Sequence, residues 1–368
     1  ISTPSNSSAA SDVYKRQAIR GMHSLLIIFL MSPLFSFFIS LFIGTYYIPF
    51  TDIITMITLK TFQLLSNIIN SISFGHIGVN VEIPYPRVSQ VVLFNIRLPR
   101  VLLAMIVGSA LAVSGAVLQA IFRNPLVNSY ILGISSGAAF GAALAIGLSL
   151  GLGVTPLAFA FALLAVFLTT SLAKIGGRIT PVSLILAGVI VNAFFSALTS
   201  LLKFLMEHEK LASVVYWLMG SFANADWHSL KVAFPIIFAG CIIISLMRWQ
   251  LNVLSFGEEA KLVGVETEKL KFAFILIVSL ITAASVAFCG IIGWVGLMIP
   301  HMVRMAFGPD HKKLIPLSIT LGASFMVLAD TLARSIATYE IPIGILTTLL
   351  GIPFFAYLLR KTGGGWHA

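Results

Sequence analysis

The side chains that could do chemistry are few, and several of them occur in close pairs. His301 is followed by Arg304, and Asp310 stands next to His311. Histidine and carboxylate side chains are good metal ligands. Pairs of this kind also stabilise the ends of helices, and we interpret these four residues as structural, at the inner end of an apolar segment. We expect no metal site, no cofactor and no catalytic residue.

Asp330 is an acid close to an apolar segment, where a carboxylate is by default functional. Arg334 lies four residues further on, so an i,i+4 ion pair on a helix explains Asp330 comparably well. Both interpretations stay open.

The cysteine and glycine patterns exclude several classes of protein. Cys241 and Cys289 lie inside apolar runs, with no spacing for a disulfide framework or zinc. No Gly-x-x-x-x-Gly-Lys-Ser/Thr sequence occurs, so the chain does not hydrolyse ATP by the P-loop route. Gly290, Gly293 and Gly296 lie between apolar segments with no strand before them, which predicts a tight or broken helix turn instead of a nucleotide fingerprint.

The composition predicts that these residues are held by helices in a lipid bilayer. Hydrophobic residues make up 58% of the 368 residues, charged residues 10%, and the mean hydropathy is +1.01. Apolar runs approach the ~20 residues needed to cross a bilayer. We expect an all-α polytopic membrane protein with about ten transmembrane helices. The expected spans are Ser24–Ile48, Val101–Phe122, Tyr130–Leu150, Pro156–Leu172, Val182–Leu205, Ser229–Met247, Phe272–Ile292, Val295–Phe307, Leu314–Ala333 and Ile343–Leu359.

Three stretches fall outside this pattern. Residues 1–17 are Ser-rich and polar, and we expect a disordered or non-native segment followed by one transmembrane domain over 18–368. The amphipathic stretch Pro49–Ile96 should lie outside the bilayer. The segment at about 252–269 is too charged for the hydrocarbon core and should form short surface helices.

Net charge is +10, but the basic residues are scattered at the ends of the apolar runs, which argues against nucleic acid as a partner. Placing the N-terminus in the cytoplasm puts most of the 23 Lys and Arg residues inside, in agreement with the positive-inside rule.

Small residues recur at the spacing at which membrane helices pack closely. Gly108 precedes Ala112 and Ala116, and Gly133, Gly137 and Gly141 form a second series. We interpret these glycines, with Gly293 and Gly296, as helix-packing positions.

Several segments together resemble the permease family of ABC importers for siderophore iron, haem and cobalamin, the FecCD type. They follow one another over nearly the whole chain after Arg20: Arg97-Leu98-Pro99-Arg100, Gly108 to Gln119, Arg123-Asn124-Pro125-Leu126, Ile131 to Gly137, Gly257 to Val265, Gly293 to Arg304, Gly308-Pro309-Asp310-His311, Ala329 to Arg334, Glu340 to Gly344, and Gly351 to Phe355.

The resemblance implies a type II importer permease in the bacterial inner membrane, embedded in lipid and paired with a second copy or a paralogue. Two cytoplasmic ATPase subunits and a periplasmic or lipid-anchored binding protein would complete it. Arginines matching Arg97, Arg100 and Arg334 dock acidic residues of the binding protein. Arg97 and Arg100 are expected at the outer N-terminus of a helix, where the macrodipole disfavours cations. An anionic partner would offset this, and lipid headgroup anchoring is the alternative.

The loop from Gly257 resembles the family's coupling helices, which sit in a groove of the ATPase. Its acids could pair with basic groups there, and an interfacial helix on lipid is the alternative. The residues concerned are Gly257, Glu258, Glu259, Ala260, Leu262, Gly264 and Val265.

We expect import of an iron chelate, a siderophore or haem, driven by a separate ATPase, so that the chain itself is a transport subunit and not an enzyme. Cobalamin or an oxyanion is the alternative cargo for the same architecture. An ion-coupled secondary transporter should carry acids in the middle of its spans, and an intramembrane protease needs a catalytic constellation that the sequence lacks. The cargo, the pore-lining residues and the choice between homodimer and heterodimer stay open.

Overall fold

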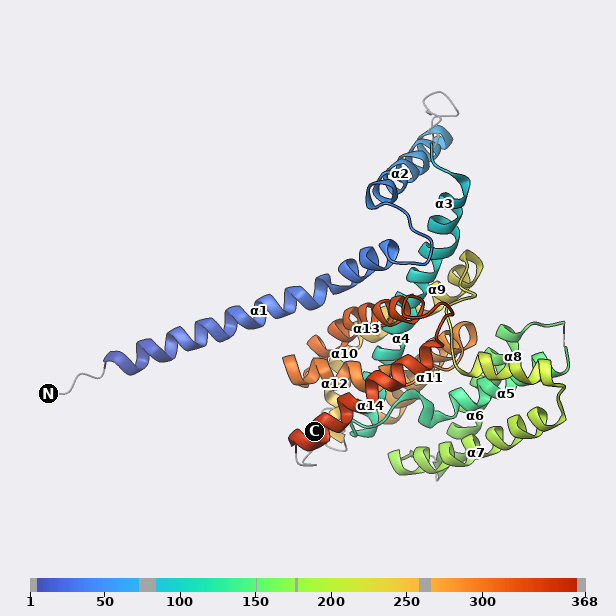
Figure 1. The fold of residues 1–368 in the computed structure, drawn as a ribbon. Helices are drawn as coiled ribbons and strands as arrows, with labels where there is room; N and C mark the ends of the chain where they lie inside the picture. Colours follow the sequence, from blue (N-terminus) through green and yellow to red (C-terminus); the bar gives the residue numbers. More distant parts are fainter. Residues whose placement is uncertain (1–4, 73–83, 150, 176–177, 258–265, 363–368) are drawn as a thin grey trace.

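The computed structural model describes residues 5–72, 84–149, 151–175, 178–257 and 266–362, and it is a bundle of helices (Figure 1). The helices are α1 Ser5–Phe42, α2 Phe50–Ile72, α3 Arg87–Val91, the π-helical η1 Val92–Arg97, α4 Leu98–Phe122, the 3₁₀ turn η2 Ser129–Leu132, α5 Ile134–Gly147, α6 Val154–Ala173, α7 Pro181–Leu205, α8 His208–Leu218, α9 Trp227–Leu246, α10 Arg248–Ser255, α11 Thr267–Cys289, α12 Val295–Phe307, α13 His311–Ala333 and α14 Ile343–Thr362. Two short antiparallel strands, β1 Lys174–Ile175 and β2 Arg178–Ile179, join α6 to α7.

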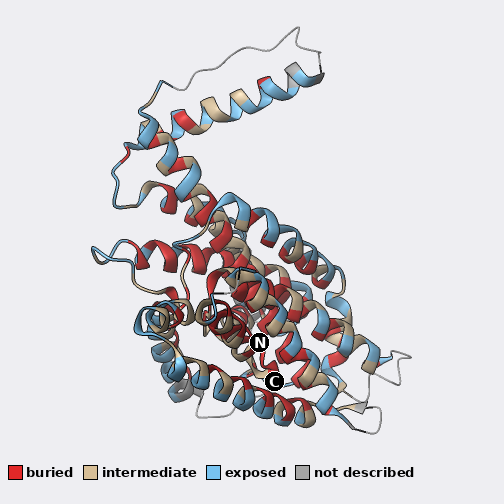
Figure 2. Ribbon diagram, turned by 90° about the vertical axis from the view of Figure 1, so that its right-hand side faces the viewer, coloured by how far each residue is buried: buried red, intermediate tan, exposed pale blue. Residues whose placement is uncertain are grey.

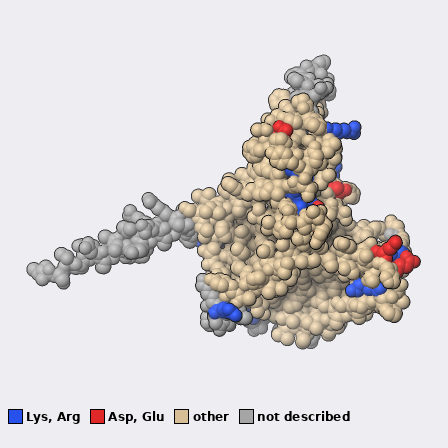
Figure 3. Space-filling model, in the orientation of Figure 1, with Lys and Arg blue, Asp and Glu red and all other residues tan. Residues whose placement is uncertain are grey.

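Seven helical segments in the described part are long and apolar enough to cross a membrane. Their best windows have mean hydropathies between 1.6 and 2.5, and three shorter apolar helices lie in α5, α12 and α14. Figure 3 shows that charged side chains are sparse on one face of the molecule and lie mainly towards its margins. Since a lipid-facing surface must be apolar, this distribution fits a multi-pass membrane protein.

A continuous helix made of α3, η1 and α4 forms the centre of the bundle. It runs without a break from Arg87 to Phe122, and 83% of its apolar window is buried, against 17% for the window in α1. The α9, α11, α12 and α13 helices all pack against α4. The buried residues accordingly gather on the inward faces of the bundle, as Figure 2 shows.

The second span begins earlier than the sequence predicted. The expected start was Val101, which gave a span near the length needed to cross a bilayer. In the structure the helix is already formed at Arg87, and a π-helical turn over Val92–Arg97 directly precedes Pro99. Proline cannot donate a backbone hydrogen bond, and a wider turn before it is one way for a helix to accommodate the ring. Arg97 and Arg100 therefore lie inside a helix and not at its N-terminus, so the predicted dipole cost does not apply.

Other boundaries also differ from the expected ones. Helix α1 begins at Ser5, and the expectation of a disordered or non-native segment over residues 1–17 stays a prediction. Residues 50–72 of the amphipathic stretch form α2, which projects from the bundle (Figure 1). Helix α8 was not predicted, because its eleven residues are too few to give a membrane signal.

The break between α11 and α12 confirms the predicted helix turn. Gly290 follows the last residue of α11 with φ +69°, and Trp294 precedes α12 with φ +70°. A positive φ costs little for glycine, so Gly290 allows the chain to reverse between two apolar helices.

Close backbone contact holds α4 against α13 at one level. A Cβ atom added to Gly108 would lie 2.2 Å from the carbonyl oxygen of Gly322, and one added to Gly322 would lie 2.5 Å from that of Gly108. A side chain at either position would force the two backbones apart. Residue 108 was predicted as a packing glycine, and Gly322 was not.

The other predicted packing glycines differ in how closely a neighbouring backbone approaches them. A Cβ atom on Gly137 would lie 2.3 Å from the oxygen of Phe161, and one on Gly141 would lie 2.4 Å from that of Leu157, so α5 and α6 are in close contact. Further along, Gly133 has φ +83° at the start of α5, and a Cβ atom on Gly296 would lie 2.9 Å from the oxygen of Leu111. By contrast, a Cβ atom on Gly293 would meet nothing within 4 Å.

Candidate functional site

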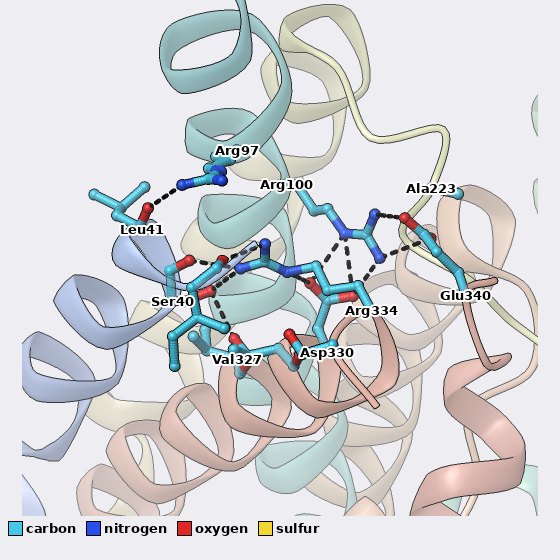
Figure 4. Close-up of polar contacts among 12 residues, drawn as sticks. Ser40, Leu41, Arg97, Arg100, Ala223, Val327, Asp330, Arg334 and Glu340 are labelled. Atoms are coloured by element: carbon cyan, nitrogen blue, oxygen red, sulfur yellow. Dashed lines mark hydrogen bonds and ion pairs between the residues drawn. The ribbon is translucent and has the colours of Figure 1, made fainter. Parts of the chain in front are cut away.

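A compact group of charged side chains gathers at one end of the bundle, around Arg100 (Figure 4). Arg100 donates from Nε to Asp330 Oδ2 at 3.0 Å and from Nη2 to Oδ1 at 2.8 Å. Its Nη1 and Nη2 also donate to the two oxygens of Glu340, at 2.7 and 3.0 Å. The guanidinium is therefore shared between a carboxylate on α13 and one in the turn before α14. We call Arg97, Arg100, Asp330, Arg334 and Glu340 the arginine cluster.

The other two arginines of the cluster bind the end of α1. Arg334 Nη1 donates to the carbonyl of Ile43 at 2.6 Å, and its Nη2 donates to Ser40 Oγ at 2.9 Å. Arg97 Nη1 donates to the carbonyl of Leu41 at 2.7 Å. The last carbonyls of a helix have no partner within the helix and carry partial negative charge. Cations are therefore favourable at this position.

All three arginines are buried, with exposed fractions of 4% for Arg97, 7% for Arg100 and 8% for Arg334. Asp330 is 1% exposed, and its Oδ2 lies 3.7 Å from Nε of Arg334, which confirms the i,i+4 proximity expected from the sequence. Glu340 differs from these residues, because 44% of its side chain is exposed. The chain itself therefore supplies two carboxylates to the three arginines.

A cavity of about 620 Å³ lies at the opposite end of α4. Its lining includes Gln119, Asn252, Arg304, Asp310 and His311. Gln119 accepts a hydrogen bond from Arg304 Nη2 at 2.9 Å, and Asn252 Oδ1 accepts from the backbone N–H of His311 at 2.9 Å. These contacts join α12 to α4 and α10 to α13.

Asp310 serves as the N-cap of α13. Its Oδ1 accepts from the backbone N–H of Lys312 at 2.9 Å and from Asn252 Nδ2 at 2.7 Å. These two hydrogen bonds, the backbone one first, lower the pKa of Asp310 below its ordinary value. His301, which the sequence placed next to this group, also lines the cavity, so the residues interpreted as structural do meet at one end of the bundle.

Gly257, the first residue of the predicted coupling segment, lies beside the same cavity. It has φ +67°, and a Cβ atom there would lie 2.4 Å from Nη1 of Arg123. Arg123 itself ends α4 with φ +49°. The other predicted coupling residues, Glu258, Glu259, Ala260, Leu262, Gly264 and Val265, lie outside the described residues.

The sequence did not single out Glu340, although it lies in the quoted segment Glu340-Ile341-Pro342-Ile343-Gly344. Its distance from Arg100, 240 positions along the chain, hides the contact from any local pattern. The one signal in the sequence for Glu340 was that it is a lone acid between two apolar segments, close to the predicted docking residue Arg334.

The apolar helices, the broken turn between α11 and α12 and the buried charges at one end define a polytopic helical membrane protein. The profile of the FecCD transport family matches residues 30–361. The chain therefore belongs to the FecCD transport family.

The relatives are permeases of import systems. The chain is 44% identical over 278 residues to a cobalamin import system permease protein of Halobacterium salinarum, covering 75% of each chain. It is 47% identical over 293 residues to a molybdate import system permease protein of Haemophilus influenzae, covering 76% of this chain and 83% of that one. A solved structure of a metal-chelate type ABC transporter in an inward-facing conformation is 38% identical, with a TM-score of 0.76, and covers 92% of this chain and 99% of the other. The chain is thus an ABC importer permease of the FecCD type and a multi-pass inner-membrane protein.

Proposed function

We propose that this permease imports an iron chelate, a siderophore or haem, and that a separate ATPase drives it. The observation that carries the proposal is the likeness, over 92% of the chain, to a transporter of the metal-chelate type. Cobalamin and oxyanions are the alternative cargoes, and the similarity to a cobalamin and a molybdate permease supports keeping both. The chain supplies the transmembrane path and no catalytic residue.

We further propose ten spans, made of the seven long apolar helices and the three shorter ones. The outer surface of α7 carries large exposed apolar residues, among them Val182, Leu186, Ile190 and Phe194. Such a face needs lipid or another apolar surface against it, and a second permease copy or paralogue would share that role. Two ATPase subunits and a binding protein complete the proposed importer.

From the positive-inside rule we propose that the arginine cluster lies outside and Lys312 inside. We expect a single cysteine introduced at exposed Asn224 to react with a membrane-impermeant thiol reagent in intact cells. A cysteine at exposed Lys312 should react only after the membrane is opened. Both variants would be made in a background without Cys241 and Cys289. The reverse labelling pattern would contradict the orientation.

Docking of the binding protein is proposed at the arginine cluster. The cluster contains three cations and two carboxylates, 3 − 2 = +1, at the end of the bundle assigned to the outside. An acidic patch on the partner would complement this charge and speed its encounter. Because the arginines are buried, a partner reaches them only at the exposed edge of the cluster, where Glu340 lies.

Coupling to the ATPase is proposed for the segment Gly257–Val265, whose first residue, Gly257, lies near Arg123 at the cavity at the other end of α4. A valine at Gly257 would have to adopt φ +67° and would push the guanidinium of Arg123 aside. Left-handed backbone alone costs roughly 1–2 kcal/mol for a residue with a side chain, and each 1.4 kcal/mol is about a tenfold effect. We therefore expect Gly257→Val to reduce uptake about tenfold or more.

The measurement is uptake together with ATP hydrolysis by the reconstituted permease and ATPase. Hydrolysis should continue in Gly257→Val while uptake falls, and membrane insertion should be normal. Gly151→Ala is the matched control, because a Cβ atom at Gly151 meets nothing within 4 Å. Normal uptake by Gly257→Val would count against a coupling role for this segment.

A further inference from the structure

Glu340 is the one member of the arginine cluster that is both bound to Arg100 and open to solvent. It accepts from both terminal nitrogens of Arg100, at 2.7 and 3.0 Å, while 44% of its side chain is exposed. Arg100 has 8% of its side chain exposed, and Asp330 has 2%. Figure 4 shows Glu340 on the opposite side of the guanidinium from α1. Glu340 therefore covers the side of Arg100 that faces away from the rest of the cluster.

The pairing between Arg100 and Glu340 can be exchanged without stranding a buried charge. Arg100 keeps its hydrogen bonds to Asp330 from Nε and Nη2 when Glu340 leaves. Once released, Glu340 is exposed enough to be hydrated. Asp330 is buried, so a break of its contact with Arg100 would leave its carboxylate without water to replace the lost hydrogen bonds. A carboxylate from another protein could make the same two-pronged hydrogen bonds to Arg100 that Glu340 makes now.

The charge of the cluster favours such an exchange. With Glu340 in place the cluster sums to +1, and without it the sum is 3 − 1 = +2. When Glu340 leaves, the exposed side of the Arg100 guanidinium attracts an acidic partner. The exchange costs little free energy if a carboxylate of the partner takes the place of Glu340.

The turn that carries Glu340 is hydrogen-bonded to the last residue of α13 and to the turn that follows α8. The N–H of Ile341 donates to the carbonyl of Ala333 at 3.0 Å, and the N–H of Ile343 donates to that of Gly220, also at 3.0 Å. Tyr339 and Glu340 also form one wall of a cleft of about 530 Å³, whose other wall includes Tyr216 on α8. A displacement of Glu340 would therefore shift the start of α14 and change the shape of this cleft.

We propose that Glu340 is an internal latch, a carboxylate that holds the docking position on Arg100 until an external carboxylate of the binding protein replaces it. The proposal rests on the docking role given to the arginine cluster above. It adds that docking is a competition between two carboxylates for the guanidinium of Arg100. Displacement of Glu340 then moves the turn that carries it, and this movement reaches α14 and α8.

The test uses hexaglutamate peptide as a carboxylate probe, with the full chain in nanodiscs of neutral lipid. Glu340→Gln removes the competing charge and keeps the shape of the side chain. Glu209→Gln on α8 is the matched control, because Glu209 is an exposed acid and the variant has the same net charge. We expect Glu340→Gln to bind the probe about fivefold or more tightly than Glu209→Gln at low salt, since coupling between sites is typically 5- to 150-fold.

A third variant, Arg100→Lys, separates the latch from the docking proposal. Lysine keeps a cation beside Asp330 but cannot form the two-pronged contact, so the gain from Glu340→Gln should vanish in the double variant. Equal affinities of Glu340→Gln and Glu209→Gln would overturn the latch. If Arg100→Lys leaves probe binding unchanged while Glu340→Gln still strengthens it, Arg100 is not the receptor and the docking proposal fails as well.

A purely structural role for Glu340 predicts a different result. Removing a structural ion pair lowers the thermal stability of the permease and leaves probe affinity equal to the control or below it. Melting temperature and probe affinity measured on the same samples therefore decide between the two roles. The binding protein that stimulates ATP hydrolysis by the unmodified complex should show the same order of affinities as the peptide.

Discussion

Replacing Asp330 by asparagine is expected to destabilise the folded permease by about 3–5 kcal/mol, the usual loss when one partner of a buried ion pair is removed. Asp330 is 1% exposed and lies between Arg100 and Arg334, at 2.8 and 3.7 Å. Without the negative charge of Asp330, the repulsion between the two buried guanidinium groups is less well compensated. The measurement is the free energy of unfolding in detergent micelles titrated with a denaturing detergent.

Glu340→Gln is the comparison that makes this experiment specific. Both substitutions remove one negative charge from Arg100, but the Glu340 side chain is 44% exposed and that of Asp330 is 2% exposed. Solvent screens an exposed pair, which is typically worth less than about 1 kcal/mol. Equal losses in the two variants would mean that burial does not set the energies in this cluster.

Replacing Gly115 by alanine is the second change with a large expected effect. An added Cβ atom would lie 1.8 Å from the carbonyl oxygen of Gly296, which belongs to the backbone of α12 and cannot rotate away. Overpacking of a well-filled core costs about 1–3 kcal/mol, and a contact this short should reach or exceed the upper value. We expect a clear fall in melting temperature and in the yield of folded permease.

Gly151→Ala again provides the control, since the same methyl group meets no atom within 4 Å there. Gly115→Ala and Gly151→Ala differ in the contact and not in the chemical change. A Gly115→Ala permease as stable as the control would contradict the close approach of α4 and α12.

Hydropathy predicted the class of this protein, because lipid imposes apolar runs of about 20 residues that local composition reveals. The same reasoning found the break at Gly290, where apolar helices follow one another with a glycine between them. Boundaries were less well predicted. The second span was expected to start at Val101, yet a π-helical turn over Val92–Arg97 continues the helix back to Arg87.

The candidate site was predicted residue by residue but not as an arrangement. Arg97, Arg100 and Arg334 were named together as docking residues, which stays a prediction, and Asp330 was expected to be near Arg334. What the sequence could not provide was their burial and the pairing of Arg100 with Glu340, which depends on how α4 and the turn before α14 meet in space. Ion pairs between residues 230 or 240 positions apart leave no periodic pattern. The close approach of Gly115 to Gly296 is hidden for the same reason.

The most direct test of the central claim is uptake by the permease reconstituted in vesicles with its ATPase and a ligand-loaded binding protein. Iron-siderophore, haem, cobalamin and molybdate would be offered in parallel, with ATP enclosed on the cytoplasmic side and no ion gradient. The account predicts that an iron chelate accumulates and stimulates ATP hydrolysis, and that neither occurs without the binding protein. Accumulation driven by a proton or sodium gradient in the absence of ATP would contradict it.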